Sequence, residues 1–276
     1  MRLVPTGLMP QLYSCLVALA DGYDGFLIDL DGVVWLGHEL IEGSAEALAA
    51  LEAAGKPVSF VTNSPRVTPA EQARILREQG VETDESRVVT AGSTLLALAR
   101  DRIGEGAPVF ATGTHGFLGQ VAGAGFETVG TDRWQDASGV LVTGHPHFNY
   151  DELKAASMAV RSGAFFAATG KDPTMPMPDG LWPGTGSILA AIETAAGREA
   201  LIAGKPEEPI FRAGLAVLDL PEGSRVAMIG DRLDTDVGGA QRAGLDGILV
   251  AGNDSVPAGT DITPDHEISR LLDLTA

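Results

Sequence analysis

The sequence predicts an α/β fold, a Rossmann-like core of parallel strands with a second α/β unit inserted into it. From residue 25 to residue 103, short apolar segments typical of buried strands alternate with segments of helical periodicity. A Gly- and Pro-containing connection at 103–108 interrupts this alternation, which then restarts, and the first pattern resumes after Gly197. We therefore expect a discontinuous core, residues 1–103 and 199–276, around an inserted domain at 104–198.

Composition narrows the classes of protein that the chain can belong to. The chain has 276 residues, of which 45% are hydrophobic, so a sizeable core is expected. Its 37 acidic and 19 basic residues give a net charge of −18, which argues against binding of nucleic acids and of anionic membranes. The single cysteine, Cys15, cannot form an intramolecular disulfide and fits a cytoplasmic location. No apolar run approaches the roughly 20 residues of a membrane span.

The first part of the core should contain three strands and four helices. A helix at 11–20 leads to a strand at 25–31. Ser44 is placed to cap the next helix, and a strand follows at 57–63. Thr68, Pro69 and Glu71 form the start signal of another helix, with a capping box. A strand at 87–90 and a helix at 93–102 complete this part.

The inserted domain repeats the strand–helix alternation. We expect strands at 109–112, 127–129, 139–143 and 164–168, and helices at 117–122, 151–161 and 185–196. Residues 171–186, rich in Pro and Gly, are expected to form one long loop, and loops of this length inside compact domains are usually functional. The pair His145 and His147 lacks neighbouring residues with the spacing of metal ligands, so we expect a surface turn there.

The end of the chain should return to the core sheet. A strand at 200–203 precedes Lys205, a helix follows at 207–217, and a strand at 225–229 precedes Asp231. A helix at 236–243, a strand at 247–250 and a short helix at 268–272 complete the predicted elements.

Polar side chains follow four of these predicted strands. Asp29 and Asp31 end the first strand, Thr62 and Asn63 end the second, and the remaining groups follow two later strands: Lys205, Asp231 and Asp236. In an open parallel sheet, ligands bind in the crevice outside the carboxyl ends of the strands. We therefore expect these side chains to meet at one site, with the inserted domain standing over it.

This set of groups matches the needs of phosphoryl transfer. Two carboxylates at one strand end repel each other, and a Mg2+ ion, which prefers carboxylate ligands, relieves the repulsion. One aspartate can act as nucleophile and the other as general acid and base. Thr62 and the Asn63 N–H can donate to phosphate oxygens, and Lys205 supplies a positive charge. The calcium-binding EF-hand pattern fails, because Val33 and Leu40 stand where it requires acids or amides.

Taken together, these motifs resemble those of the haloacid dehalogenase (HAD) superfamily of phosphohydrolases. The resemblance covers about residues 25–252, and the insertion resembles the large α/β cap domain of the subgroup with 4-nitrophenylphosphatases, pyridoxal phosphate phosphatase and glycerol-phosphate phosphatases. It rests on runs at 29–35, 61–63, 204–206 and 230–236, and on cap-like motifs at 144–153, 172–176 and 183–187.

The resemblance implies a role for each residue. Asp29 is then the nucleophile and a Mg2+ ligand, Asp31 is the general acid and base and binds Mg2+ through its backbone carbonyl, and Asp231 is the third protein ligand. Thr62 and Lys205 hold the phosphate, and Asp236 orients Lys205 or a water bound to the metal. Asp172, in the loop at 171–186, is expected to select the leaving group. The cap is also a candidate surface for a homodimer.

From the sequence we expect a cytoplasmic phosphoric monoester hydrolase that uses Mg2+, forms an aspartyl-phosphate and acts on a small phosphorylated metabolite. The run 172–176 is closer to glycerol-phosphate-type relatives, and Thr174 and Met175 differ from the pyridoxal phosphate branch. Two alternatives stay open at this point. One is a phosphotransferase or mutase of the same superfamily, and the other is a protein that binds a phosphorylated metabolite without catalysis.

Overall fold

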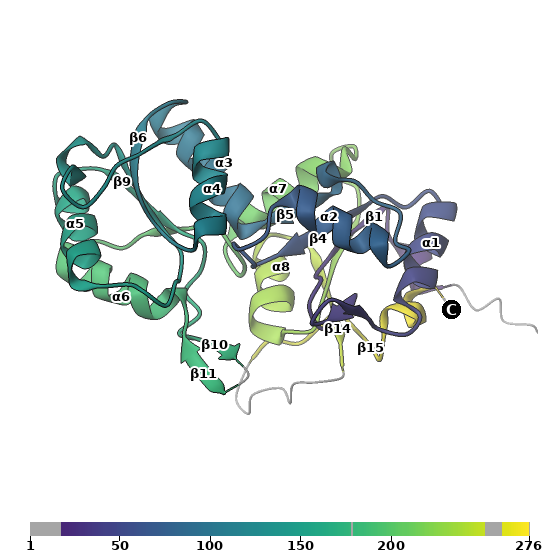
Figure 1. The fold of residues 1–276 in the computed structure, drawn as a ribbon. Coiled ribbons are helices and arrows are strands. Elements are labelled where there is room, and N and C mark those ends of the chain that lie inside the picture. Colours follow the sequence, from purple (N-terminus) through teal and green to yellow (C-terminus); the bar gives the residue numbers. More distant parts are fainter. Residues whose placement is uncertain (1–17, 178, 252–260, 276) are drawn as a thin grey trace, which may run out of the picture.

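The computed structural model describes residues 18–177, 179–251 and 261–275. These residues form two parallel sheets, each covered by helices, that lie side by side (Figure 1). We call the layers around the six-stranded sheet the first unit and those around the five-stranded sheet the second unit. Cys15 and most of the helix expected at 11–20 lie outside the described residues, and Leu19–Gly22 forms a short 3-10 helix.

The first unit is built on a fully parallel six-stranded sheet. Its spatial order is β15 (His266–Ile268), β14 (Asp246–Val250), β13 (Val226–Gly230), β1 (Gly25–Ile28), β4 (Val58–Thr62) and β5 (Val88–Thr90). Strand β1 lies in the middle, hydrogen-bonded to β13 on one side and to β4 on the other. The carboxyl ends of β13, β1 and β4 therefore meet at one edge of the sheet, as the sequence predicted.

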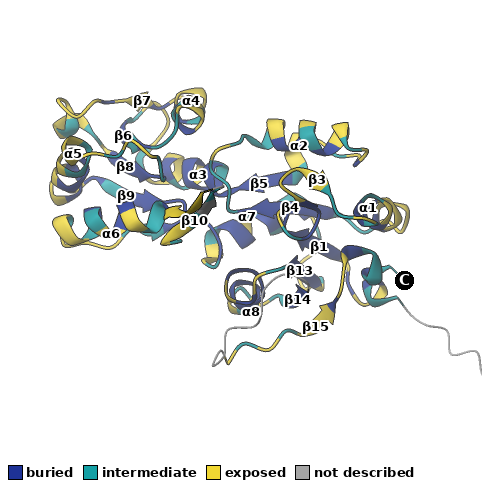
Figure 2. Ribbon diagram, turned by 60° about the horizontal axis from the view of Figure 1, so that its bottom comes forward, coloured by how far each residue is buried: buried dark blue, intermediate teal, exposed yellow. Residues whose placement is uncertain are grey.

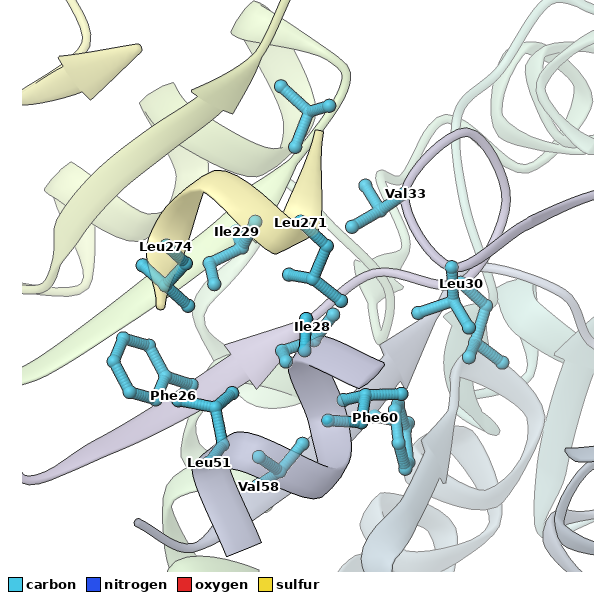
Figure 3. Packing of buried hydrophobic residues seen from close by; sticks show 14 of the residues in the cluster. Phe26, Ile28, Leu30, Val33, Leu51, Val58, Phe60, Ile229, Leu271 and Leu274 are labelled. Atoms are coloured by element: carbon cyan, nitrogen blue, oxygen red, sulfur yellow. The ribbon is translucent and has the colours of Figure 1, made fainter. Parts of the chain in front are cut away.

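Helices cover both faces of this sheet. Helices α1 (Ser44–Ala53) and α2 (Pro69–Glu78) pack on the face that carries Phe26 and Ile28, together with the C-terminal Leu271 and Leu274 (Figure 3). Helices α7 (Glu208–Leu218) and α8 (Gly238–Arg242) cover the face that carries Leu27. Because both faces are covered, all four residues of β1 are buried and apolar.

The second unit is a five-stranded parallel sheet between two pairs of helices. The strand order is β12 (Leu201–Ile202), β9 (Phe165–Ala168), β8 (Gly139–Val142), β6 (Pro108–Thr112) and β7 (Glu127–Thr128). Helices α5 (Tyr150–Arg161) and α6 (Thr185–Ala196) cover one face, and α3 (Ala91–Ile103) and α4 (His115–Gly123) cover the other. In Figure 2 the strands β6, β8 and β9 are mostly buried, whereas β7 at the edge of the sheet and the outer sides of the helices are exposed.

The second unit reaches beyond the insertion that the sequence predicted. We expected a strand at 200–203 in the core sheet, and this is wrong, because β12 pairs with β9 of the second sheet. Leu95 and Ala99 of α3 also pack against the second sheet. The division at 103/104 and 198/199 stays a prediction, and we propose to place α3 and β12 with the second unit.

Three local predictions differ from the structure. The expected loop at 171–186 contains an antiparallel hairpin of β10 (Thr174–Met177) and β11 (Gly180–Pro183). A second hairpin, for which the sequence made no prediction, follows Asp31 and consists of β2 (Trp35–Leu36) and β3 (Glu39–Leu40). The helix expected at 268–272 is replaced by the end of β15 and a 3-10 helix at Leu271–Leu274. Gly43, not Ser44, caps α1, because the Ser44 hydroxyl donates to the Val33 carbonyl.

Thr68 caps α2 as predicted, with its hydroxyl accepting the N–H of Glu71. Among the described residues, every helix falls short of the length and apolar character needed to cross a bilayer.

Candidate active site

Three aspartates meet at the carboxyl ends of β1 and β13. Asp29 follows β1, Asp231 follows β13, and Asp236 lies in the single turn of π-helix Leu233–Val237. One carboxylate oxygen from each residue lies within 4.8 Å of the other two. The sequence predicted this meeting, because neighbouring parallel strands end at the same edge.

Asp29 is buried and held in one orientation. Its Oδ1 atom accepts the backbone N–H of Leu30 at 2.8 Å and lies 2.8 Å from Nζ of Lys205. Burial raises the pKa of Asp29 to about 7, although the Lys205 cation opposes this shift. Both described contacts use Oδ1, so Oδ2 has no hydrogen-bond donor within the described part of the chain and is free to meet a metal or an electrophile.

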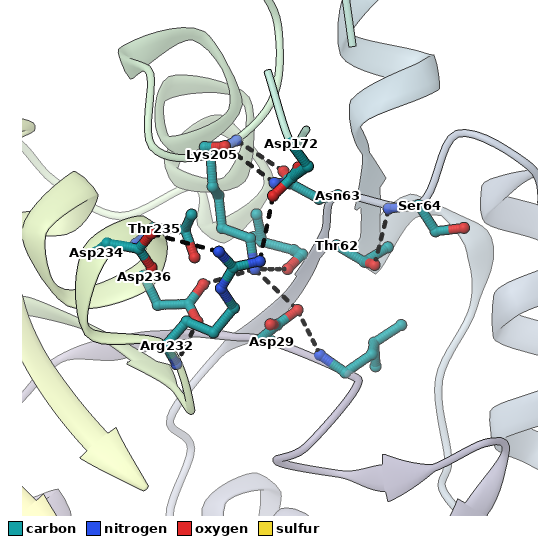
Figure 4. A network of polar contacts seen from close by, with 12 residues as sticks. Asp29, Thr62, Asn63, Ser64, Asp172, Lys205, Arg232, Asp234, Thr235 and Asp236 are labelled. Atoms are coloured by element: carbon teal, nitrogen blue, oxygen red, sulfur yellow. Dashed lines mark hydrogen bonds and ion pairs between the residues drawn. The ribbon is translucent and has the colours of Figure 1, made fainter. Parts of the chain in front are cut away.

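Lys205 is buried at the centre of the site (Figure 4). Its Nζ atom lies 2.7 Å from Asp236 Oδ1 and 2.8 Å from Asp29 Oδ1, and it donates to the Val61 carbonyl at 3.1 Å. Burial lowers the pKa of Lys205, but the carboxylates of Asp236 and Asp29 outweigh burial and hold that pKa above its ordinary value. The ammonium is therefore charged and offsets part of the repulsion among the three aspartates.

Two glycines let the acidic side chains approach the backbone. Gly32 has a φ of +84°, and a Cβ there would lie 2.1 Å from Oδ2 of Asp231. A Cβ on Gly230 would lie 2.2 Å from Cβ of Asp236. Burial, followed by the Asp236 charge, raises the pKa of Asp231 to about 6. The sequence places glycine where any side chain would displace these carboxylates.

The donor set fits Mg2+, which prefers carboxylate oxygens. Asp29 Oδ2 and the side chain of Asp231 are free of other described donors. Asp236 is already committed, because Oδ1 pairs with Lys205 and Oδ2 accepts the N–H of Arg232 at 3.0 Å. Asp29 and Asp231 would therefore hold the ion directly, and Asp236 would act through Lys205 or a bound water.

Thr62 and Asn63 follow β4 but have different surroundings. Thr62 is buried, and its hydroxyl accepts the N–H of Ser64 at 3.2 Å, which leaves the hydroxyl hydrogen available. The Asn63 side chain binds the backbone of Lys205 on both sides, accepting its N–H at 2.7 Å and donating to its carbonyl at 2.9 Å. Asn63 therefore fixes the position of Lys205, and only its backbone N–H could meet a phosphate.

Asp31 is exposed and belongs to the turn that leads into β2. Its Oδ1 atom accepts the indole N–H of Trp35 at 3.0 Å, and the N–H of Gly32 donates to the Trp35 carbonyl. This side chain is not part of the three-carboxylate cluster. Its exposure fits exchange of a proton with a bound ester or with water.

A residue that the sequence reasoning missed, Arg232, joins the two units. Its guanidinium lies between Asp172 of the second unit, at 3.2 Å, and Asp234, at 3.3 Å (Figure 4). Asp172 is thus brought to the site, as expected. The signal in the sequence was a single basic residue within the acidic run 231–236.

His145 and His147 lie in the second unit, after β8. Nε2 of His145 lies 3.4 Å from Glu152, and the ring packs edge-on against Phe148. No described group of three metal-binding side chains includes either histidine.

The fold and the site define a parallel α/β enzyme with an acidic metal site at the strand ends. The model for the haloacid dehalogenase-like hydrolase family matches residues 26–127, and a related HAD-hydrolase-like model matches residues 202–274. The chain is 34% identical over 271 residues to a D-glycerol 3-phosphate phosphatase of Mycobacterium tuberculosis, covering 92% of this chain and 74% of the relative.

Further similarities agree with this match. An acid sugar phosphatase of Staphylococcus epidermidis is 35% identical over 231 residues, covering 83% of this chain and 86% of the relative. A crystal structure of the glycerol phosphate phosphatase from Mycobacterium tuberculosis, in complex with magnesium, superposes with a TM-score of 0.81 at 32% identity, covering 94% of this chain and 78% of that chain.

The chain belongs to the haloacid dehalogenase-like hydrolase family. This match confirms the predicted superfamily and the predicted α/β fold with a second unit. It also confirms the prediction of a phosphoric monoester hydrolase with magnesium as its cofactor.

Proposed function

We propose that the protein hydrolyses a small hydroxylated phosphomonoester, such as a glycerol phosphate or a related triose or sugar phosphate, with Asp29 as nucleophile. The observation that carries this proposal is the arrangement around Asp29. Its Oδ1 is fixed by Leu30 and Lys205, no donor in the described part of the chain reaches Oδ2, and a carboxylate oxygen of Asp231 lies within 4.8 Å of one of Asp29. The similarity to the glycerol phosphate and acid sugar phosphatases supports the substrate class.

In this proposal the carboxylate of Asp29 attacks phosphorus, and the bond from phosphorus to the ester oxygen breaks. Asp31 gives its proton to the leaving oxygen and then takes one from the water that attacks the aspartyl-phosphate. Thr62, the Asn63 N–H and Lys205 face the phosphate oxygens. Mg2+, held by Asp29, Asp231 and the Asp31 backbone carbonyl, would neutralise phosphate charge when bound.

The local positive charge matters because the whole chain carries a net charge of −18, which repels phosphate esters at long range. Lys205 and the metal therefore have to supply the attraction for the substrate within the site itself.

Trapping of the covalent intermediate tests the role of Asp29. The enzyme is mixed with Mg2+ and 4-nitrophenyl phosphate and quenched with borohydride, which reduces an aspartyl-phosphate to homoserine. Peptide mass spectrometry should find homoserine at position 29 in the wild type. Asp29→Asn should show neither homoserine nor turnover, whereas Asp101→Asn, on the exposed side of α3, should behave as wild type. Turnover without homoserine at position 29 would show direct attack by water.

The substrate class is tested by a panel of phosphomonoesters that includes glycerol phosphates, triose and sugar phosphates, phosphoglycolate, nucleotides and pyridoxal phosphate. A cytoplasmic location and a homodimer through the second unit also stay predictions. Fractionation of cells and sedimentation of the purified protein would test them.

A further inference from the structure

Arg232 connects the candidate metal site to the second unit. Its backbone N–H donates to Asp236 at 3.0 Å, while its guanidinium donates to Oδ1 of Asp172 at 3.2 Å. The side chains of this Arg–Asp pair are 45% and 36% exposed, so the pair contributes little to folding stability. Its consequence is instead geometric, because it fixes where the Asp172 carboxylate lies relative to the site.

The backbone of Asp172 is fixed as well. Its carbonyl accepts the N–H of Gly186 at 2.8 Å, which ties the segment to the start of α6. A Cβ on Gly186 would lie 2.8 Å from that carbonyl oxygen, and one on Gly170 would lie 3.4 Å from Oδ2 of Asp172. The carboxylate is therefore held from both ends, by the backbone below it and by Arg232 at Oδ1.

The two oxygens of this carboxylate have different surroundings in the described part of the chain. Oδ1 accepts from Arg232, but within the described residues no group donates to Oδ2. A carboxylate oxygen accepts hydrogen bonds and cannot donate them, so it favours a ligand that carries hydroxyl groups. It disfavours an additional anion.

The charge around Arg232 points the same way. Asp172 and Asp234 both contact the guanidinium, so two negative charges face one positive charge. Because the guanidinium is already paired with these two carboxylates, it is poorly placed to bind a carboxylate or a second phosphate on the leaving group.

We propose that Arg232 is a positioning residue that presents Oδ2 of Asp172 to a hydroxyl of the leaving group. The pair thereby selects phosphomonoesters whose leaving group is uncharged and carries hydroxyl groups. This inference rests on the proposed phosphatase function and narrows its substrate class. Two esters isolate the effect of the leaving-group hydroxyls. sn-Glycerol 3-phosphate and n-propyl phosphate have the same three-carbon chain, and only the first carries hydroxyl groups.

The experiment measures kcat/KM for both esters with the full chain and Mg2+. The wild type should prefer glycerol 3-phosphate. Arg232→Met and Asp172→Asn should each reduce this preference by roughly 10- to 100-fold, the range for a hydrogen bond to a charged group. The double variant should lose little more than either single variant, because both changes remove the same contact. Arg232→Lys should recover part of the preference.

Arg212→Met is the matched control, because Arg212 contacts only Glu208 on the exposed side of α7 in the described structure, and it should leave the preference unchanged. Equal losses on both esters in Arg232→Met would overturn the proposal, as would additive losses in the double variant or a wild type that prefers propyl phosphate. A wild type that hydrolyses neither these esters nor 4-nitrophenyl phosphate would instead contradict the phosphatase function, and this inference with it.

Discussion

Lys205 and Asp236 form a buried ion pair, with Nζ 2.7 Å from Oδ1, although they follow strands of different sheets. Lys205 follows β12 of the second sheet, whereas Asp236 follows β13 of the first. The same ammonium contacts Asp29 at 2.8 Å. The cation that completes the site therefore lies on the connection from β12 to α7, where the Asn63 side chain and the Val61 carbonyl hold it at the end of β4.

Lys205→Met should destabilise the Mg2+-free protein by about 3–5 kcal/mol, because it leaves buried carboxylates without their cation. Urea unfolding at neutral pH measures this change. Arg74→Met removes an exposed pair with Glu78 on α2 and should cost only about 0.3–0.5 kcal/mol. Similar costs for the two variants would contradict the stabilising role of the buried ion pair.

Mg2+ should stabilise the protein more at pH 8 than at pH 5.5. Burial raises the pKa of Asp29 to about 7 and that of Asp231 to about 6, both above the unfolded value of 3.8. In the metal-free protein these groups contribute stability that is present below about pH 4 and lost as the pH rises through about 6 to 7. Mg2+ binds the deprotonated carboxylates, so its affinity rises over the same range.

At a Mg2+ concentration 100 times its dissociation constant, binding stabilises by about 2.7 kcal/mol. Thermal unfolding with and without Mg2+, at matched ionic strength, gives the comparison at each pH. Asp231→Asn should weaken the Mg2+ effect at pH 8. An effect of Mg2+ that is larger at pH 5.5 than at pH 8 would contradict the prediction.

Asn63→Ala should impair catalysis through Lys205 rather than through a lost phosphate contact. The substitution removes two hydrogen bonds, of 2.7 and 2.9 Å, that hold the Lys205 backbone. We expect a loss of about 1–3 kcal/mol in stability and a fall in kcat/KM for 4-nitrophenyl phosphate. The neighbouring Ser64→Ala is the control and should change both quantities little. Unchanged stability in Asn63→Ala would show that these bonds do not hold Lys205.

The sequence predicted the three-carboxylate cluster because Asp29 and Asp231 directly follow strands with a clear apolar pattern, and Asp236 comes shortly after the second of them. β1 and β13 have four and five buried residues, and neighbouring parallel strands end at one edge. Glycines 32 and 230 marked the points where these strands leave the sheet. Such local signals suffice when the fold brings together strand ends of a single sheet.

The sequence could not assign β12 to its sheet, because β12 is two residues long and buried apolar strands look alike in both sheets. The sequence did not predict the hairpin of β10 and β11, for a different reason. All four residues of β11 are exposed, so it has no buried face to produce an alternating pattern. Arg232 and Asp172 meet across sixty residues of sequence, and an arginine among acids is typical of a solvated surface.

Gly32→Ala should disrupt the metal site by a direct clash. Gly32 has a φ of +84°, and its new Cβ would lie 2.1 Å from Oδ2 of Asp231, so the carboxylate must move. We expect a loss of stability of about 1–3 kcal/mol and a higher Mg2+ requirement for turnover of 4-nitrophenyl phosphate. Gly37→Ala is a matched control, since Gly37 also has a positive φ, +58°, but a Cβ there meets no described atom within 4 Å. Gly37→Ala should therefore show only the backbone cost, about 1 kcal/mol, and a normal Mg2+ requirement. An equal Mg2+ requirement in the two variants would show that Asp231 does not depend on the space that Gly32 leaves for it.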